Sequence, residues 1–432
     1  MMLATLYSHL GDFERHRPIY HITPAKGHSN DPNGLFYDPV HDRYHLWVQW
    51  NEYVLGGGKS GWYHFVSSDL VKWERLGLDP AHNISGCSGG ATRAPDGTPT
   101  LIFCSGQTAV PINRSDPLLR QWRVNGTDFT RAAYNPRDTT GKWDGSVSRD
   151  ALGRYVVTFG SCKTANHTQR PAPRQCGTPQ ILSYRSSDLR TWEYLGEQWS
   201  FPSGQWPVPA PYQPFHPAPF DVVRTECPYV WDDGDRTLVK LSMPGFGRDY
   251  VFVGGMTGNG SHFVPSSAGT ILDWGEFYAA AVLEDTSRAR HLLWGWVLSL
   301  YNITATTGAQ FDGALSLPRV MDFATGALPR WEIAPEIAAL RSGPPTVLIR
   351  LTVPPHTAVP LRLPRDASGD AVEIMMNMSH ASVLAAPLGL MVRSARHAAS
   401  SQSRCTLTRL ANGLPASREA VCNCPLAPSA RT

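Results

Sequence analysis

Short apolar runs separated by polar turns recur along most of the chain. Runs such as residues 44–50 (YHLWVQW) and 229–231 (YVW) are shorter than usual helices. They lie among Gly, Pro, Asn and Asp, as β-strands do. Sustained helical periodicity is scarce up to residue 319. Beyond it, residues 325–342 tolerate a helix, and residues 346–353 alternate again. The pattern predicts an all-β protein.

One eleven-residue pattern occurs twice and indicates a repeat fold. Residues 67–77 (SSDLVKWERLG) and 186–196 (SSDLRTWEYLG) are identical at eight positions, and residues 115–122 (SDPLLRQW) form a degenerate third copy. The Ser-Asp pairs start 47 and 72 residues apart, an average near 60, which suits a four-stranded propeller blade. Residues 17–322 are therefore predicted to form a five-bladed β-propeller, and residues 345–432 a shortened, β-sandwich-like C-terminal region.

Composition supports this fold and excludes several partners. The 432 residues include 38 Gly, 36 Pro and 14 Trp, which is typical of short strands, tight turns and an aromatic binding cleft. The net charge is +3 without a basic run, so neither a nucleic acid nor an anionic membrane is an expected partner. No apolar stretch has the length of a membrane span.

Two features predict an extracellular or secretory-pathway protein. One is a set of seven N-glycosylation sequons, at Asn83, Asn113, Asn125, Asn166, Asn259, Asn302 and Asn377. The other is eight cysteines without paired CxxC zinc spacing, among which Cys162 and Cys176 bracket a loop that a disulfide could close. Residues 1–18 lack the apolar core of a signal peptide, so the targeting segment is expected to be missing from this sequence.

The motif NDPNG at residues 30–34 places Asp31 between two asparagines, a proline and a glycine. These residues predict a tight turn that presents a carboxylate with amide donors beside it. An ordinary hairpin turn has the same composition.

Two further acids have suggestive neighbours. Asp138 follows Arg137, which can hold a carboxylate ionised, and Glu226 comes shortly before the strand at 229–231. With Asp31 they fall in different predicted blades, so all three can point into one central funnel. Two carboxylates on opposite sides of a glycosidic bond are the machinery of glycoside hydrolysis. The simpler alternatives are an Arg137–Asp138 ion pair and a Glu226 on the solvated rim.

In this order and spacing, NDPNG, the Arg-Asp pair and Glu226-Cys227 resemble the signature blocks of glycoside hydrolase family 32, the invertases, inulinases, levanases and fructosyltransferases. Further similar blocks lie at residues 62–73, 273–279, 292–297 and 314–319. The resemblance extends from about residue 21 to residue 319.

The resemblance implies a retaining β-fructofuranosidase that hydrolyses sucrose or a fructan without cofactor or metal. Asp31 would be the nucleophile and Glu226 the acid/base, while Asp138 would stabilise the transition state. Cys227 would shape the surroundings of Glu226 and stay outside any disulfide. Positions that would bind the substrate are Asn30, Gln49, Arg137, Trp62 and Ser88.

Three expected aromatic wall positions differ from the family pattern. They correspond to His28 with Ser29, to residues 56–58 (GGG), and to the residue before Ser88 and Gly89. Because aromatic faces supply much of the contact area for a sugar, the pocket is expected to be weaker or wider. Fructosyl transfer, glycan binding without turnover, and a related arabinoside-cleaving activity therefore remain alternatives.

Overall fold

The computed structural model describes residues 17–18, 20–53, 58–78, 88–125, 128–130, 142–163, 178–201, 225–232, 235–243, 247–273, 277–297, 311–322 and 328–341, and four strands between residues 371 and 425. The chain divides into two compact units. One contains residues 21–304 and 310–338, and the other contains residues 1–20, 305–309 and 339–432.

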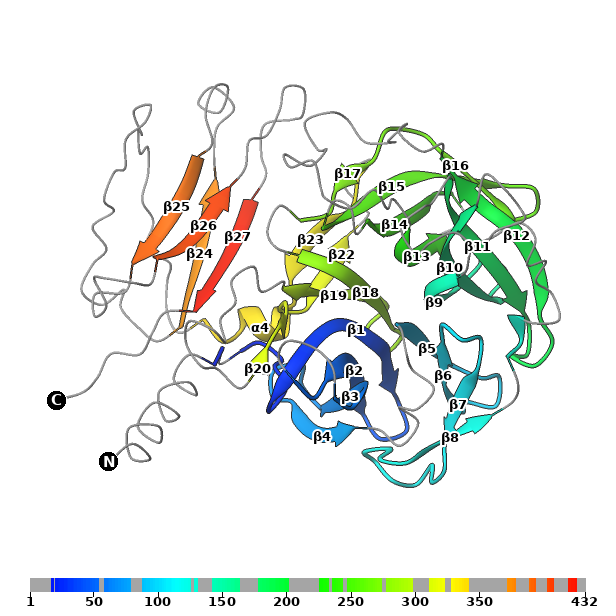
Figure 1. Ribbon diagram of the computed structural model, residues 1–432, viewed down its shortest axis with the longest axis horizontal. Coiled ribbons are helices and arrows are strands. Elements are labelled where there is room, and N and C mark those ends of the chain that lie inside the picture. The colour runs from blue at the N-terminus through cyan, green and yellow to red at the C-terminus, as the bar shows by residue number, and fades with distance from the viewer. Residues whose placement is uncertain are drawn as a thin grey trace. The chain divides into compact units, whose positions relative to one another are not determined.

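The larger unit consists of five antiparallel blades (Figure 1). The first contains β1 (Gly27–Asp38), β2 (Arg43–Asn51), β3 (Ser60–Ser67) and β4 (Glu74–Leu78). The second contains β5 (Gly89–Arg93), β6 (Pro99–Phe103), β7 (Thr108–Pro111) and β8 (Trp122–Asn125). The third contains β9 (Lys142–Arg149), β10 (Tyr155–Lys163), β11 (Thr178–Ser186) and β12 (Glu193–Ser200).

The fourth blade contains β13 (Glu226–Asp232), β14 (Thr237–Met243), β15 (Arg248–Thr257) and β16 (His262–Pro265), and β17 (Thr270–Ile271) also pairs with β15. The fifth contains β18 (Phe277–Asp285), β19 (Arg290–Val297), β22 (Arg319–Asp322) and β23 (Arg330–Ile333), and β21 (Ala314–Leu315) also pairs with β19. The short helix α4 (Pro335–Ala338) follows β23. The predicted all-β, five-bladed propeller is confirmed.

The first strands of the blades form the inner ring. β1 contacts β5, β5 contacts β9, β9 contacts β13, β13 contacts β18, and β18 contacts β1. Large apolar side chains are buried between neighbouring blades, for example Leu46 with Trp294 and Trp62 with Phe103. Residues far apart in the sequence therefore meet along one axis.

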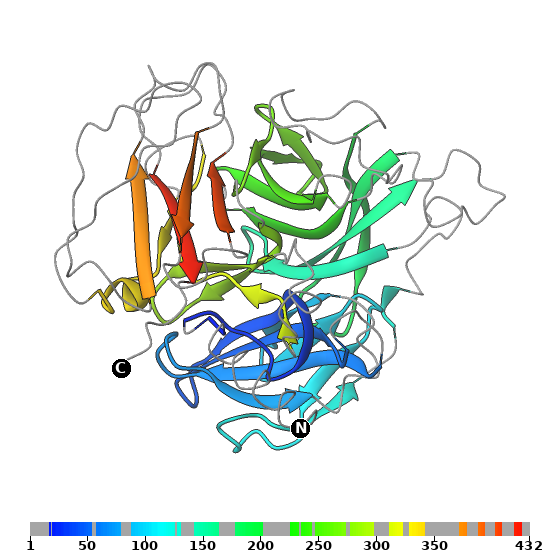
Figure 2. The same cartoon turned by 60° about the vertical axis from the view of Figure 1, so that its left-hand side comes forward.

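A short late segment joins the first blade to the last. The strand β20 (Phe311–Asp312) pairs in parallel with β1, and β21 next to it pairs with β19. The Leu315 amide donates to the Ile22 carbonyl at 2.9 Å, and His21 Nδ1 donates to the Leu315 carbonyl at 2.7 Å. In Figures 1 and 2 this yellow segment lies beside the blue first blade. The ring is closed by pairing between its two ends.

The repeated eleven-residue pattern lies between the third and fourth strands of its blades. Ser67 Oγ accepts the amides of Asp69 and Leu70, and Ser186 Oγ accepts those of Asp188 and Leu189. In both copies the aspartate then accepts the next two amides. The repeat is thus one turn used twice, because the same side chains satisfy the same backbone donors.

The NDPNG motif forms no isolated tight turn, so that prediction is wrong. All five residues lie inside β1, whose pairing with β2 shifts between Ser29 and Pro32 and again between Asn33 and Phe36. A proline cannot donate to the ladder, and β1 accommodates it at these β-bulges. The bulges still give Asp31 an irregular backbone that aims its side chain.

The smaller unit contains two antiparallel strand pairs. One joins β24 (Ala371–Asn377) to β27 (Glu419–Pro425), and the other joins β25 (Leu388–Arg393) to β26 (Gln402–Leu407). These strands agree with a β-rich C-terminal region, while the shortened sandwich stays a prediction. Across the described residues, no helix has both the length and the apolar character needed to span a bilayer.

Substitution of Gly313 tests the importance of ring closure. Gly313 has a φ of +78°, and an added Cβ would overlap the Ser29 carbonyl oxygen. Gly196 has a φ of +86° with open space around it. We expect Gly196→Ala to cost about 1 kcal/mol of unfolding free energy and Gly313→Ala at least about 2 kcal/mol more. Chemical denaturation measures both, and equal losses would contradict the steric role.

Candidate active site

Asp31 is buried at the axis with three side chains donating to it. Ser88 Oγ donates to Oδ2 at 2.5 Å, Asn30 Nδ2 to Oδ1 at 3.0 Å, and Cys227 Sγ to Oδ2 at 3.4 Å. Asp31 itself is 8% exposed. These donors come from three different blades, and they stabilise a carboxylate that burial would otherwise disfavour.

Gln49 completes a polar group around Asp31. Its Oε1 accepts Asn30 Nδ2 at 3.0 Å and lies 3.5 Å from Ser88 Oγ. The structure therefore brings three of the residues expected to bind substrate, Asn30, Gln49 and Ser88, to one place beside Asp31. Their contact with a sugar stays a prediction.

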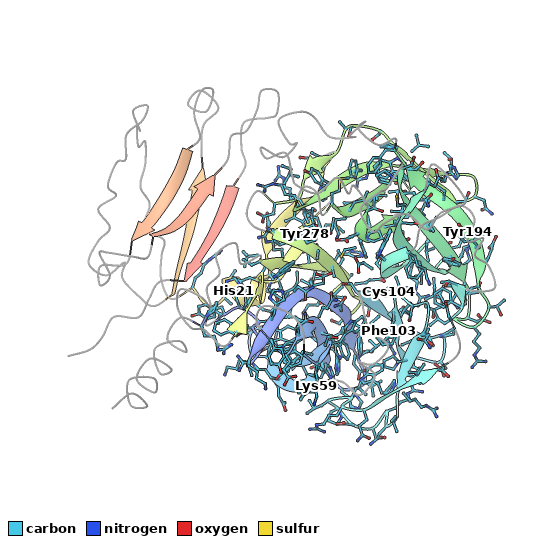
Figure 3. The ribbon with its side chains drawn as sticks, viewed as in Figure 1. His21, Lys59, Phe103, Cys104, Tyr194 and Tyr278 are labelled. Carbon is cyan, nitrogen blue, oxygen red and sulfur yellow. The ribbon has the colours of Figure 1, made fainter. Side chains whose placement is uncertain are left out.

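Glu226 is the first residue of β13 and is 9% exposed. The hydroxyl of Tyr278 on β18 donates to Glu226 Oε2 at 2.8 Å. Figure 3 shows Tyr278 on the blade next to β1. This contact fixes the carboxyl group of Glu226 in orientation and links the fourth blade to the fifth.

Asp144 is a further acid at the axis that no sequence motif indicates. It is 8% exposed, and its Oδ1 accepts the Ser88 amide at 3.0 Å. One ligand atom each of Asp31, Asp144 and Cys227 lies within 4.8 Å of the other two. Such a group has the spacing to hold a cation, whereas the sequence predicts no metal; that absence stays a prediction.

The same backbone device presents several of these residues. The strand registers shift around residues 30–31 of β1, 144–145 of β9, 227–228 of β13 and 279–280 of β18. Asp144, Cys227 and Ala279 have left-handed φ angles of +46°, +42° and +52°. A β-bulge re-aims a side chain, and strained non-glycine residues cluster at functional sites. Four of the five inner strands thus bend at the level of Asp31.

Burial and neighbouring acids set the protonation chemistry. Desolvation raises the pKa of Asp31, and the charge of Glu226 raises it further, while hydrogen bonds from Ser88, Cys227 and Asn30 act in the opposite direction. Burial, together with the charges of Asp144 and Asp31, raises the pKa of Cys227 well above its usual value. The thiol therefore stays protonated, which suits its role as a donor to Asp31.

Burial also raises the pKa of Tyr278 well above its ordinary value, with the charge of Glu226 as the next cause. The phenol therefore remains a hydrogen-bond donor to Glu226 across the working pH range of enzymes. Asp31 and Glu226 form an interacting pair in which each carboxylate has its own donors.

Asp138 and Arg137 lie outside the described residues, so their expected roles stay predictions. Trp62 is 1% exposed, and its ring packs 4.8 Å from that of Phe103 in the core. Its expected sugar contact also stays a prediction.

His28 occupies the first altered wall position. Its Nδ1 lies 3.2 Å from Asp312 Oδ2, and its ring meets that of Trp296 edge-on at 5.7 Å. An imidazole held by a carboxylate and an indole replaces the expected large aromatic. Of the second altered position, residues 56–58, the structure describes Gly58 alone.

Cys227 is the free cysteine among residues whose side chains the structure describes, in agreement with what the family resemblance implies. Cys104 and Cys162 are disulfide-bonded. Cys176 lies outside the described residues, so its pairing with Cys162 stays a prediction.

A small cavity of about 40 Å³ continues along the axis from the site. This volume has room for one or two water molecules. Its walls include the site residues Ser88 and Cys227 and residues that follow the site residues on the inner strands, among them Pro32, Gly145, Pro228 and Ala280.

Residues 21–331 match the family model described as the glycosyl hydrolases family 32 N-terminal domain. The chain belongs to glycosyl hydrolase family 32. It is 30% identical over 389 residues to "Beta-fructofuranosidase, insoluble isoenzyme 6" of Oryza sativa subsp. japonica, covering 76% of this chain and 58% of that protein. It is also 30% identical over 373 residues to the "Fructan 6-exohydrolase" of Triticum aestivum, with the same coverage.

The chain thus spans less than two thirds of the length of these relatives. Among solved structures, fructan 1-exohydrolase IIa from Cichorium intybus is similar with a TM-score of 0.62 and 20% identity, covering 87% of this chain and 66% of that one. This likeness supports the propeller fold.

Removal of the Ser88 hydroxyl should shift the titration of Asp31. That hydrogen bond lowers the pKa of Asp31, so Ser88→Ala should raise this pKa further, because the ionised carboxylate loses a donor. We expect the acidic limb of the kcat/KM profile to move to higher pH by the same amount, because ionised Asp31 then requires a higher pH. Ser88→Thr, which retains a hydroxyl, is the control. An unmoved acidic limb in Ser88→Ala would contradict the assignment.

Proposed function

We propose that this chain is a retaining β-fructofuranosidase that hydrolyses sucrose or a fructan. The observation that carries the proposal is the pair of buried carboxylates, Asp31 and Glu226, which reach the axis from different blades and interact electrostatically. Membership of family 32 and the activities for which the relatives are named agree with this chemistry.

In the first step Asp31 attacks the anomeric C2 of fructose, and Glu226 gives its proton to the leaving oxygen. The C2–oxygen bond breaks as the fructosyl–Asp31 ester forms. In the second step Glu226 takes a proton from water, the water oxygen attacks C2, and Asp31 leaves. Asn30 and Gln49 are placed beside Asp31 to bind fructose hydroxyls.

We assign the role of third carboxylate to Asp144. The resemblance assigned that role to Asp138, but Asp144 has the supporting geometry, with burial, a bulged backbone and close proximity to Asp31 and Cys227. A negative group there stabilises positive charge that develops on the sugar ring in the transition state. The Ser88 amide holds Asp144 in place.

The imidazole of His28 should stack on a sugar ring more weakly than the large aromatic side chain expected at this position. An imidazole covers less area than the expected large aromatic, so sugar specificity rests more on hydrogen bonds from Asn30, Gln49 and Ser88. We expect a high KM for sucrose.

We also propose an extracellular or secretory location. Cys104 and Cys162 form disulfides, which persist in oxidising compartments. Sequon residues Asn113, Asn125 and Asn259 are exposed. A relative from Pisum sativum is named as a cell wall isozyme.

Product analysis with sucrose, inulin and levan tests the activity. Equal glucose and fructose from sucrose identify an invertase, and fructose from the polymers identifies a fructanase. Excess glucose with new oligomers would instead indicate fructosyl transfer.

Substitution of the two carboxylates tests their roles. Glu226→Gln should lower kcat about 10²- to 10⁴-fold, the usual contribution of a general acid/base, and Asp31→Asn should lower kcat by several orders of magnitude.

Circular dichroism and thermal unfolding must show each variant folded. With an aryl β-fructofuranoside, whose leaving group needs little proton donation, Glu226→Gln should form the ester on Asp31 faster than it hydrolyses it, and mass spectrometry should detect one added fructosyl unit. Folded wild-type protein that yields no product from any of the three sugars would favour glycan binding without turnover.

Parallel substitution separates the two candidates for the third carboxylate. We expect Asp144→Asn to lower kcat/KM at least about 10²-fold, as expected for loss of electrostatic transition-state stabilisation, and Asp138→Asn to lower it less. Both are measured on sucrose at constant pH. The reverse order would return the role to Asp138.

A further inference from the structure

A buried ion pair lies in the fourth blade behind the carboxyl of Glu226. Lys240 on β14 is 1% exposed and Asp249 on β15 is fully buried, and their charged groups lie 3.6 Å apart. Lys240 Nζ also donates to Ser242 Oγ at 3.2 Å. Burying two charges costs free energy that their attraction need not recover, so the pair calls for an explanation beyond stability.

The strand register places this pair in line with Glu226. Glu226 on β13 is paired with Ser242 on β14, and Ser242 is paired with Asp249 on β15. Cross-strand partners present their side chains on the same face of a sheet. The acid/base residue, the serine and the buried aspartate therefore form one row across the blade.

Asp249 also binds the inner strand of the next blade. Its Oδ1 accepts the Ala279 amide at 3.1 Å, and its Oδ2 accepts the Ala280 amide at 2.6 Å. These two amides belong to the β-bulge of β18, where Ala279 has its left-handed φ. The bulge removes both from the ladder with β19, and a single carboxylate satisfies them.

The residue immediately before this bulge is Tyr278, the donor to Glu226. Tyr278 is the last residue of β18 in register with β19 before the bulge. The position of its hydroxyl is therefore determined by the backbone that Asp249 holds.

We infer that Lys240 and Asp249 are positioning residues for the acid/base of the proposed hydrolysis. Lys240 orients the Asp249 carboxylate, Asp249 fixes the bulge of β18, and the bulge directs the Tyr278 hydroxyl onto Glu226. The inference rests on the proposed function for its chemical consequence and on the contacts alone for its geometry.

The alternative is that the pair serves stability alone, and leaving-group dependence separates the two roles. Proton donation by Glu226 matters for a sugar leaving group and matters little for a phenolate. We expect Asp249→Asn and Tyr278→Phe to lower kcat/KM on sucrose roughly 10-fold or more, within the range of general acid effects, and to lower it much less on an aryl β-fructofuranoside.

A double-mutant cycle tests whether the two residues act in one chain. In the Tyr278→Phe background, Asp249→Asn should lower kcat/KM on sucrose less than about 2-fold further, because coupled residues are non-additive. Lys240→Met with Asp249→Asn removes both charges, leaves no unpaired lysine, and serves if the single variant fails to fold. Independent, multiplying effects would overturn the inference.

Asp285→Asn is the matched control. Like Asp249, Asp285 is a fully buried aspartate that pairs with a basic side chain, here Arg290 at 2.9 Å. It lies on β18, at the opposite end of the strand from Tyr278. We expect it to lower thermal stability while keeping the ratio of sucrose to aryl activity unchanged. The same ratio in Asp249→Asn as in Asp285→Asn would mean a structural role only.

Failure of the proposed function is distinguishable from failure of this inference. Wild-type protein inactive on both substrates would refute the proposed function. A crystal structure of the double variant Lys240→Met/Asp249→Asn then decides whether the ion pair positions Tyr278. Displacement of the Tyr278 hydroxyl beyond hydrogen-bond distance of Glu226 supports positioning, and an unchanged 2.8 Å contact overturns it.

Discussion

The site depends on holding three carboxyl groups together at the axis of a closed ring. Asp31, Asp144 and Glu226 are each less than a tenth exposed, and burial of charge is unfavourable unless donors compensate for it. The donors are Asn30, Ser88, Cys227 and Tyr278, from four different blades. The cluster of carboxyl groups is therefore a property of the assembled ring, and no blade could maintain it alone.

Much of the architecture was predictable because its signals are local. The turn at residues 67–77 repeats at 186–196 since the same side chains satisfy the same amides, and this spacing gave the blades. Asp31 and Glu226 were identified from short motifs. Their convergence with Gln49 and Ser88 followed from the ring, in which inner strands meet regardless of their separation in sequence.

The remaining features depend on strand register, which no local motif encodes. Asp144 stands in an ordinary polar stretch, and its place beside Asp31 comes from a bulge in β9 against β10. The sequence predicts Asp138 as the third acid, because an adjacent arginine is a visible signal. Lys240 and Asp249 look like surface residues of alternating strands until β18 is packed against them.

The pairing of β20 with β1 also has a consequence for biosynthesis. His28 on β1 and Asp312 on β20 are 284 residues apart. The first blade therefore leaves the ribosome long before β20, which pairs with it, is synthesised. Contacts of such long range form late and slow folding. The ring around Asp31 can therefore close only after nearly the whole propeller has been translated, and a chain interrupted before β20 would carry Asp31 and its hydrogen-bond donors in an open ring.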